Sequence, residues 1–124
     1  MERDMDLIRN ILLKIEESSK PTGWISITID GYADSEISYH IKLLAQAGLI
    51  EAFNGSDSAG FDWKAKSLTW EGHEFLDAAR NNKIWEKTKA VIKSKALGTS
   101  FEIVKEVLKE ITVSFIKQGV IWVK

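Results

Sequence analysis

Hydrophobic and polar positions recur along the chain with two spacings, that of a helix and that of a strand. Residues 4–17 repeat apolar side chains every three or four positions, which predicts a helix with one buried stripe. Residues 24–29 instead alternate between neighbouring positions, which predicts a short strand with Ile25, Ile27 and Ile29 inward. The stripe of the first helix comprises Met5, Ile8, Leu12 and Ile15, and Ile11 widens it.

A second helix is predicted over residues 34–47, and a β-hairpin follows it. Asp34 or Ser35 can cap the helix, and Gly48 stands where a left-handed residue would close it. One side of this helix is apolar (Ile37, Ile41, Leu44), and the opposite side carries Ser35, Ser38, Tyr39, Lys42 and Gln46. Residues 49–53 and 61–68 are predicted strands around the small, turn-forming residues 54–60, and Phe61, Trp63 and Ala65 share one face.

Three more helices are predicted after the hairpin. Thr69 can cap a helix that runs through about residue 79, and Asn81-Asn82 interrupts it. Residues 83–96 carry an apolar stripe that includes Trp85, and Thr99 or Ser100 can cap the last helix. That helix has an apolar seam with the three-and-four spacing of a short coiled coil, comprising Phe101, Val104, Leu108, Ile111 and Phe115.

This order of elements predicts an α+β fold of the winged-helix type, helix-strand-helix-β-hairpin, with C-terminal helices. Residues 1–80 would form the winged-helix domain, and residues 81–124 a helical extension that serves packing or dimerisation. Winged helices carry a middle helix before the recognition helix, and residues 30–33 leave room for only about one helical turn there.

Two stretches resemble winged-helix repressors. Residues 38–50, which end in Ala-Gly-Leu-Ile, are similar to the recognition helix and the strand entry of such repressors. Leu68-Thr69 with Gly72 and Phe75-Leu76 is similar to the segment after the wing in the multiple-antibiotic-resistance and phenolic-acid-repressor families. In this segment the strand would end at Leu68, Gly72 would permit close helix packing, and Phe75 and Leu76 would enter the core.

Nearly the whole chain also resembles a family of small bacterial and phage proteins catalogued as domain of unknown function 2513. The resemblance implies a winged-helix fold, a bacterial or prophage origin and, through the fold, transcription regulation. It rests on Arg3–Arg9, Gly31-Tyr32, residues 38–50, residues 68–77 and Ile84-Trp85.

Duplex DNA is the partner that this pattern predicts. Glutamine can bind adenine, lysine can bind guanine, and hydroxyl groups can hold phosphate, so the polar side of helix 34–47 is the candidate recognition face. The hairpin would act as a wing that contacts the DNA backbone through Lys64 and Lys66. The alternative is an ordinary solvated helix face, because every amphipathic helix has one.

Charge supports a second function class. The net charge is −1, but residues 1–82 hold eight Lys and Arg against fourteen Asp and Glu, whereas residues 83–124 hold nine Lys against four Glu. Strong nonspecific DNA binding normally requires a basic face. The competing hypothesis is therefore a protein-interaction module on the same scaffold. The lysines at 83–93 form either a second phosphate-binding strip or a solvated face.

Other classes are excluded by composition or by the lack of a motif. The chain has no Cys, and His40 and His73 lack metal-ligand spacing, so we expect structural histidines, no metal and no cofactor. No phosphate loop or nucleophile motif occurs, so we expect no enzyme and no catalytic residue. The apolar runs are too short to span a membrane, and the acidic N-terminus is unlike a signal peptide, which predicts a cytoplasmic protein.

The aromatic residues and the seam yield two further expectations. We expect Trp85 to lie in the core and Trp24, Trp63 and Trp70 to pack as one cluster around the sheet. Ile103, Val107 and Ile116 widen the seam of the last helix, so part of it would pack within the chain. A symmetric homodimer would bury the rest, because isologous pairing is the commonest soluble assembly.

Overall fold

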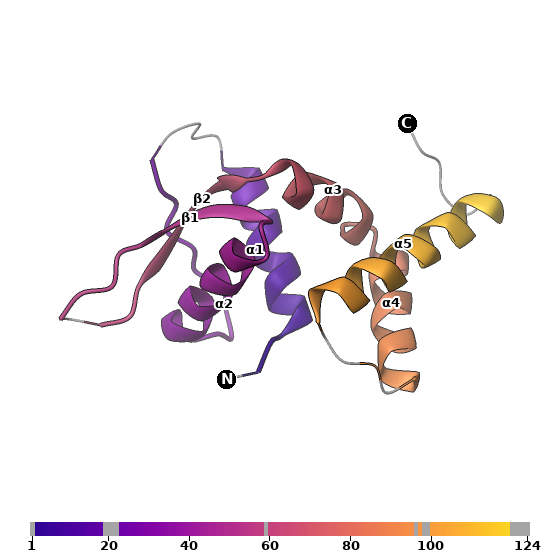
Figure 1. The fold of residues 1–124 in the computed structure, drawn as a ribbon, viewed down its shortest axis with the longest axis horizontal. Helices are drawn as coiled ribbons and strands as arrows, with labels where there is room; N and C mark the ends of the chain where they lie inside the picture. The colour runs from indigo at the N-terminus through magenta and orange to yellow at the C-terminus, as the bar shows by residue number, and fades with distance from the viewer. Residues whose placement is uncertain (1, 19–22, 59, 96, 98–99, 120–124) are drawn as a thin grey trace. The chain divides into compact units, whose positions relative to one another are not determined.

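The computed structural model describes residues 2–18, 23–58, 60–95, 97 and 100–119. It divides the chain into two compact units, Met1–Leu76 and Asp77–Lys124. The described residues form five helices and one two-stranded antiparallel sheet (Figure 1), which confirms the mixed α+β class. Among these residues, no helix is both long and apolar enough to cross a bilayer.

Helix α1 (Met5–Glu17) begins where the sequence predicts. The Asp4 side chain accepts a hydrogen bond from the backbone N–H of Leu7 at 3.0 Å and so caps the helix. The buried face differs slightly from the prediction, because Leu7 is fully buried whereas Met5 and Ile8 are only half-buried. Helix α1 packs against both α2 and β2, and these two neighbours decide which of its apolar side chains are fully buried.

The predicted strand at residues 24–29 is reduced to one bridge. The backbone N–H of Ile25 donates to the carbonyl of Ala65 at 2.7 Å, and no second pair follows. The alternation itself is confirmed: the isoleucines at 25, 27 and 29 are half-buried, and the residues between them are exposed. A pattern of side chains fixes which side faces the core, whereas a strand also requires a partner backbone over several residues.

Helix α2 (Asp34–Gln46) presents its predicted apolar side to the core. Ile37, Ile41 and Leu44 are buried, and Gly48 has the left-handed conformation, with φ of 80°, that ends the helix. The predicted caps are wrong, because the helix begins at Asp34 and its N-cap position is Ala33, which has no side-chain capping bond. The Glu36 carboxylate accepts from the backbone N–H of Ala33 at 3.3 Å and so fixes the start of the helix.

Strands β1 (Ile50–Asn54) and β2 (Trp63–Leu68) pair antiparallel, as predicted. The register pairs Ile50 with Leu68 and Asn54 with Trp63, and a bulge lies between Glu51 and Ala52. Ala65 is fully buried against the helices. The prediction that Phe61 shares a strand face with Trp63 and Ala65 is wrong, because Phe61 precedes the paired residues of β2 and is exposed.

Helix α3 (Trp70–Ala79) begins at a tight corner against the end of α2. The Thr69 hydroxyl accepts from the backbone N–H of Gly72 at 3.1 Å and donates to the carbonyl of Gly48 at 2.6 Å. The backbone N–H of Thr69 donates to the carbonyl of Leu49 at 3.0 Å. These bonds confirm the predicted cap and bring Gly72 against Leu49, while Phe75 and Leu76 enter the core as expected.

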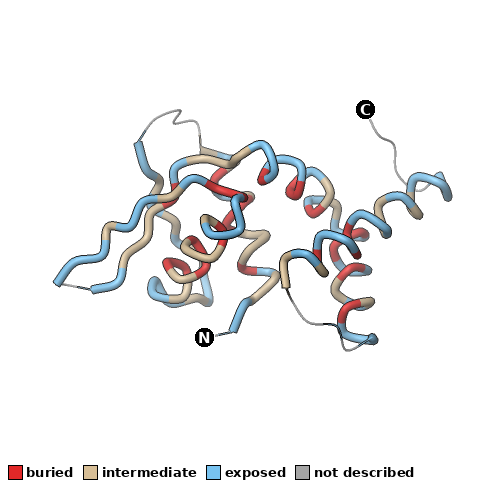
Figure 2. Tube along the Cα trace, in the orientation of Figure 1, coloured by how far each residue is buried: buried red, intermediate tan, exposed pale blue. Residues whose placement is uncertain are grey.

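The second unit contains α4 (Asn82–Ser94) and α5 (Phe101–Lys117), which pack on each other. Asn81 and Ser100 cap the two helices through their side chains. Thr99, the other predicted cap, lies outside the described residues. Buried positions recur along one side of each helix in Figure 2, and Trp85 is among them, as predicted.

A polar network joins α1 to α2 at the start of the chain. His40 is fully buried, and its ring nitrogen Nε2 accepts from the backbone N–H of Asp4 at 2.9 Å. Its Nδ1 lies 2.8 Å from the carbonyl of Glu36 and donates to it, which defines a neutral ring with the proton on Nδ1. The Tyr32 hydroxyl donates to the Asp4 carboxylate at 3.0 Å. The prediction of a structural histidine at position 40 agrees with this network.

This network predicts that the folded chain loses stability at alkaline pH, when Tyr32 deprotonates. Burial and then the hydrogen bond to the charged Asp4 carboxylate raise the pKa of Tyr32 above its usual 10.0. The folded chain therefore favours neutral Tyr32, and this contribution to stability is lost as pH rises through the raised pKa. The chain has two tyrosines, so the difference in tyrosinate absorbance between the parent and Tyr32→Phe isolates Tyr32. We expect it to titrate above pH 10.0; titration at or below that value would contradict the network.

Candidate nucleic-acid interface

The polar side of α2 is the candidate recognition face, and the structure leaves most of it accessible. Ser35 and Gln46 are exposed, and Tyr39 and Lys42 are half-buried. The prediction that Ser38 belongs to the recognition face is wrong, because this residue is only 6% exposed and faces the hairpin and the segment before α2. At 100° per residue Ser38 lies between the two sides of the helix, so the neighbouring segments decide whether solvent reaches it.

Two ring contacts position the central side chains of this face. The Tyr39 ring meets the buried His40 ring edge-on, with centroids 5.8 Å apart and an interplanar angle of 83°. The Lys42 ammonium lies 6.0 Å from the centroid of the Phe61 ring, at the outer limit of a cation–π contact. Lys42 therefore connects α2 to the hairpin loop. Local sequence pattern contains no signal for this contact, because Lys42 and Phe61 belong to different segments of the chain.

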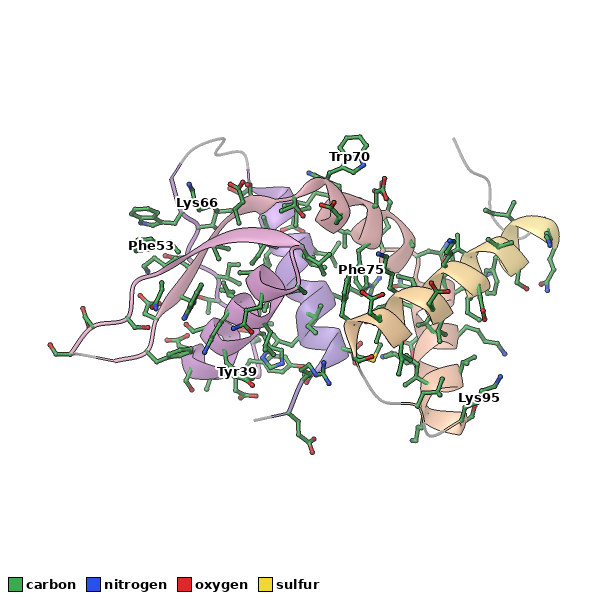
Figure 3. All side chains as sticks on the ribbon, viewed as in Figure 1. Tyr39, Phe53, Lys66, Trp70, Phe75 and Lys95 are labelled. Atoms are coloured by element: carbon green, nitrogen blue, oxygen red, sulfur yellow. The ribbon has the colours of Figure 1, made fainter. Side chains whose placement is uncertain are left out.

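The two predicted wing lysines differ in their surroundings. Lys64 forms an ion pair with Asp62 at 3.3 Å, so its charge is already partly neutralised. Lys66 is exposed and has no ion pair among the described residues. In Figure 3 Lys66 and Phe53 project from the side of the hairpin opposite Tyr39. The structure therefore brings Lys42 near the hairpin but does not place Lys66 beside the open face of α2.

The electrostatic character of α2 is mixed. Lys42 is the one cation of the helix, whereas Asp34 and Glu36 occupy its first turn. Carboxylates at this end favour the helix dipole, but they oppose a phosphate group at the same place. The face therefore lacks the basic character that charge-driven nucleic-acid binding requires.

The exposed aromatic residues do not form the predicted tryptophan cluster. Trp24 stacks on Phe53, with ring centroids 4.8 Å apart and an interplanar angle of 13°. Trp70 is 76% exposed, and its indole N–H donates to Glu74 at 2.7 Å. Among the described residues no ring contact joins Trp24, Trp63 and Trp70. The cluster prediction failed because the single bridge at Ile25 places Trp24 over β1, beside Phe53.

The seam of α5 is partly used within its own unit. Val104, Val107 and Leu108 are buried where α5 packs on α4, and Phe101, Ile111 and Phe115 remain half-buried. Pairing of two copies through the rest of the seam stays a prediction. On α4, Lys89 pairs with Glu86 at 3.2 Å, so the lysines at 83–93 do not form a uniformly basic strip.

Metal chemistry finds no support within the described residues. His40 is fully engaged in the polar network, and His73 is exposed on α3. No group of three or more His, Asp or Glu side chains with metal-binding geometry occurs in the part of the chain that the structure describes.

Comparison with known proteins places the chain in a family. The family described as "Hypothetical protein (DUF2513)" matches residues 2–98. A protein of Haemophilus influenzae described as "Uncharacterized protein" is 47% identical over 114 residues, covering 90% of this chain and 95% of the relative. No solved structure matches the chain. A match over this length, together with a full-length relative, shows that the chain belongs to the DUF2513 family.

Proposed function

We propose that the first unit is a winged helix that binds duplex DNA, as a transcription regulator would. In this proposal α2 enters the major groove, and the hairpin contacts the backbone. The observation that carries the proposal is the accessible polar face of α2, which lies opposite the buried apolar side of the same helix. On this face Lys42 reaches the ring of Phe61 in the hairpin loop. Tyr39, Lys42 and Gln46 would contact bases, and Ser35 would contact phosphate.

The low charge of this surface sets the expected strength of binding. Lys42 and the partly neutralised Lys64 are the predicted contact lysines on the side of Tyr39, since Lys66 projects from the opposite side of the hairpin. Each neutralised phosphate contributes about −0.9 to the slope of log K against log salt, so we expect a slope of about −1 to −2. Specificity would then depend on base contacts and on DNA shape more than on charge.

Fluorescence anisotropy with labelled random duplex DNA tests the proposal. We expect binding at low salt that weakens with the slope given above and at least about a tenfold loss in Lys42→Glu, because reversal removes one contact and adds repulsion. Lys109→Glu is the matched control, since it makes the same charge change at an exposed position of α5. Absence of binding at about 50 µM protein and low salt would overturn the proposal. An equal loss in both variants would show that α2 is not the contact.

The second candidate function is a protein-interaction module. It is favoured by the stacked Trp24–Phe53 pair, which leaves two large aromatic side chains about half exposed on the first unit. The charge of −6 on residues 1–82, from eight basic and fourteen acidic residues, points the same way. Failure of the DNA experiment in the parent chain would leave this candidate as the better account.

A further inference from the structure

Phe61 is a large apolar side chain that the fold leaves in contact with water. It stands in the hairpin loop just before β2, and its side chain is 45% exposed. Its ring makes no contact with another aromatic ring in the part of the chain that the structure describes. Single exposed apolar residues are common on protein surfaces, so exposure alone points to no ligand. The position of this ring beside α2 is the informative observation.

The Phe61 ring lies next to the cation of the candidate recognition face. The ammonium of Lys42 is 6.0 Å from the centroid of the ring, and Lys42 is the one lysine or arginine of α2. Lys42 forms no ion pair with any residue that the structure describes, so its N–H groups remain free to donate to a ligand. The two side chains therefore present an apolar surface and a hydrogen-bond donor side by side.

This distance determines which groove of a duplex the ring would enter. The major groove is about 12 Å wide and admits a whole helix, so a ring this close to Lys42 would enter the major groove together with α2. Base edges in that groove carry donors, acceptors and one apolar group, the 5-methyl group of thymine. On the same edge, thymine also carries the acceptor O4. Thymine thus displays together the two groups that this pair of side chains complements.

We propose that Phe61 and Lys42 together recognise thymine in the major groove, with the ring on the 5-methyl group and the ammonium donating to O4. The inference rests on the proposed DNA binding and names the base that this surface prefers. Guanine offers two acceptors to Lys42 but no apolar group to Phe61. Cytosine presents an amino donor, which a lysine cannot bind because its ammonium is also only a donor.

An apolar contact also suits the low positive charge of the surface. Asp62 follows the ring in the chain, and its carboxylate is paired with Lys64 at 3.3 Å, so its charge is partly neutralised. Burial of one methyl group against the ring would raise the affinity about fourfold. This gain requires no phosphate contact and releases no counterion, so it should not depend on salt, unlike the contribution of the lysines.

Fluorescence anisotropy with two short duplexes tests the proposal on the full chain. One duplex alternates adenine and thymine, and the other replaces every thymine by uracil, which keeps O4 and lacks only the methyl group. We expect the parent chain to bind the thymine duplex about three- to fivefold more tightly. The ratio of the two affinities should stay constant as salt is raised, while both affinities fall.

Phe61→Ala should abolish this preference and bind both duplexes equally, because it removes the ring that contacts the methyl group. Phe53→Ala is the matched control, since Phe53 is 44% exposed and projects from the side of the hairpin opposite Tyr39 (Figure 3). It should retain the preference of the parent. Both replaced side chains are exposed, and the comparison of duplexes in the parent chain requires no variant at all.

The outcomes distinguish this inference from the proposed function. Equal binding of the two duplexes by the parent would overturn the thymine contact and leave DNA binding intact. A preference that persists in Phe61→Ala would also overturn it, because the methyl group would then act through the shape of the duplex or through another residue. A preference lost in Phe53→Ala would place the contact on the other side of the hairpin. Absence of binding to either duplex would overturn both proposals.

Discussion

Replacing Gly72 by alanine is expected to destabilise the first unit by about 3 kcal/mol or more. A Cβ atom at this position would lie 1.9 Å from the carbonyl oxygen of Leu49, a distance that no relaxation of a side chain can relieve because the neighbour is backbone. The same oxygen accepts the hydrogen bond from Thr69. Opening the corner to admit the methyl group would therefore also weaken the start of α3.

Helix propensity alone predicts the opposite sign for this substitution. Alanine is better than glycine inside a helix by about 1 kcal/mol, so Gly72→Ala would stabilise α3 if the corner were loose. Urea titration, followed through the amide signals of Leu44 in the first unit and Ile92 in the second, separates the two outcomes. Gly55→Ala is the control, because its nearest neighbour is the flexible Phe53 ring at 3.4 Å. An unchanged or higher midpoint for Gly72→Ala at Leu44 would show that the corner is not closely packed.

Replacing His40 by leucine is expected to cost about 2–4 kcal/mol, the second largest effect. Leucine fills the space but cannot accept the hydrogen bond from the backbone N–H of Asp4, which then stays unpaired beside the core. The bond from Nδ1 to the carbonyl of Glu36 is lost as well. Because Asp4 caps α1 and His40 lies in α2, the loss loosens the contact between these two helices.

Two amide variants identify which ring nitrogen matters. The end of a glutamine side chain reaches the place of Nε2, whereas the shorter asparagine reaches the place of Nδ1. We expect His40→Gln to retain about half of the stability that leucine loses, and His40→Asn to resemble leucine. Thermal unfolding followed at the Leu44 amide measures the three variants together. Equal stability of the leucine and glutamine variants would show that the Asp4 bond contributes nothing.

The elements with a strong local signal were predictable from the sequence. Asp4, Thr69 and Asn81 cap α1, α3 and α4, and such signals are local because a capping side chain acts on backbone groups within three residues. The apolar side of α2, the hairpin and the core position of Trp85 followed from periodicity in the same way. The need for glycine at position 72 was also visible, as part of a segment that resembles known repressors.

The geometry of the candidate site depends on contacts between distant residues, which the spacing of neighbouring residues does not predict. The polar side of α2 was predicted correctly except at Ser38, which lies at its border and is covered by residues distant in the sequence. The pairing of Lys64 with Asp62 and the approach of Lys42 to Phe61 depend on how the hairpin bends. Neither could be derived from composition, because both join side chains through the path of the backbone.

The sequence by itself determined the five helices of the described residues, the hairpin, their order and the family, since these follow from interactions between near neighbours and from matched residues. Only the tertiary structure decided that residues 24–29 pair once with β2 and then separate from it, and that neighbouring segments cover Ser38. The physical reason is that a second segment decides both whether a stretch of chain is a strand and whether a side chain is buried. Alternation determines which side chains face the core, but the distance to the neighbouring backbone decides whether the segment joins the sheet.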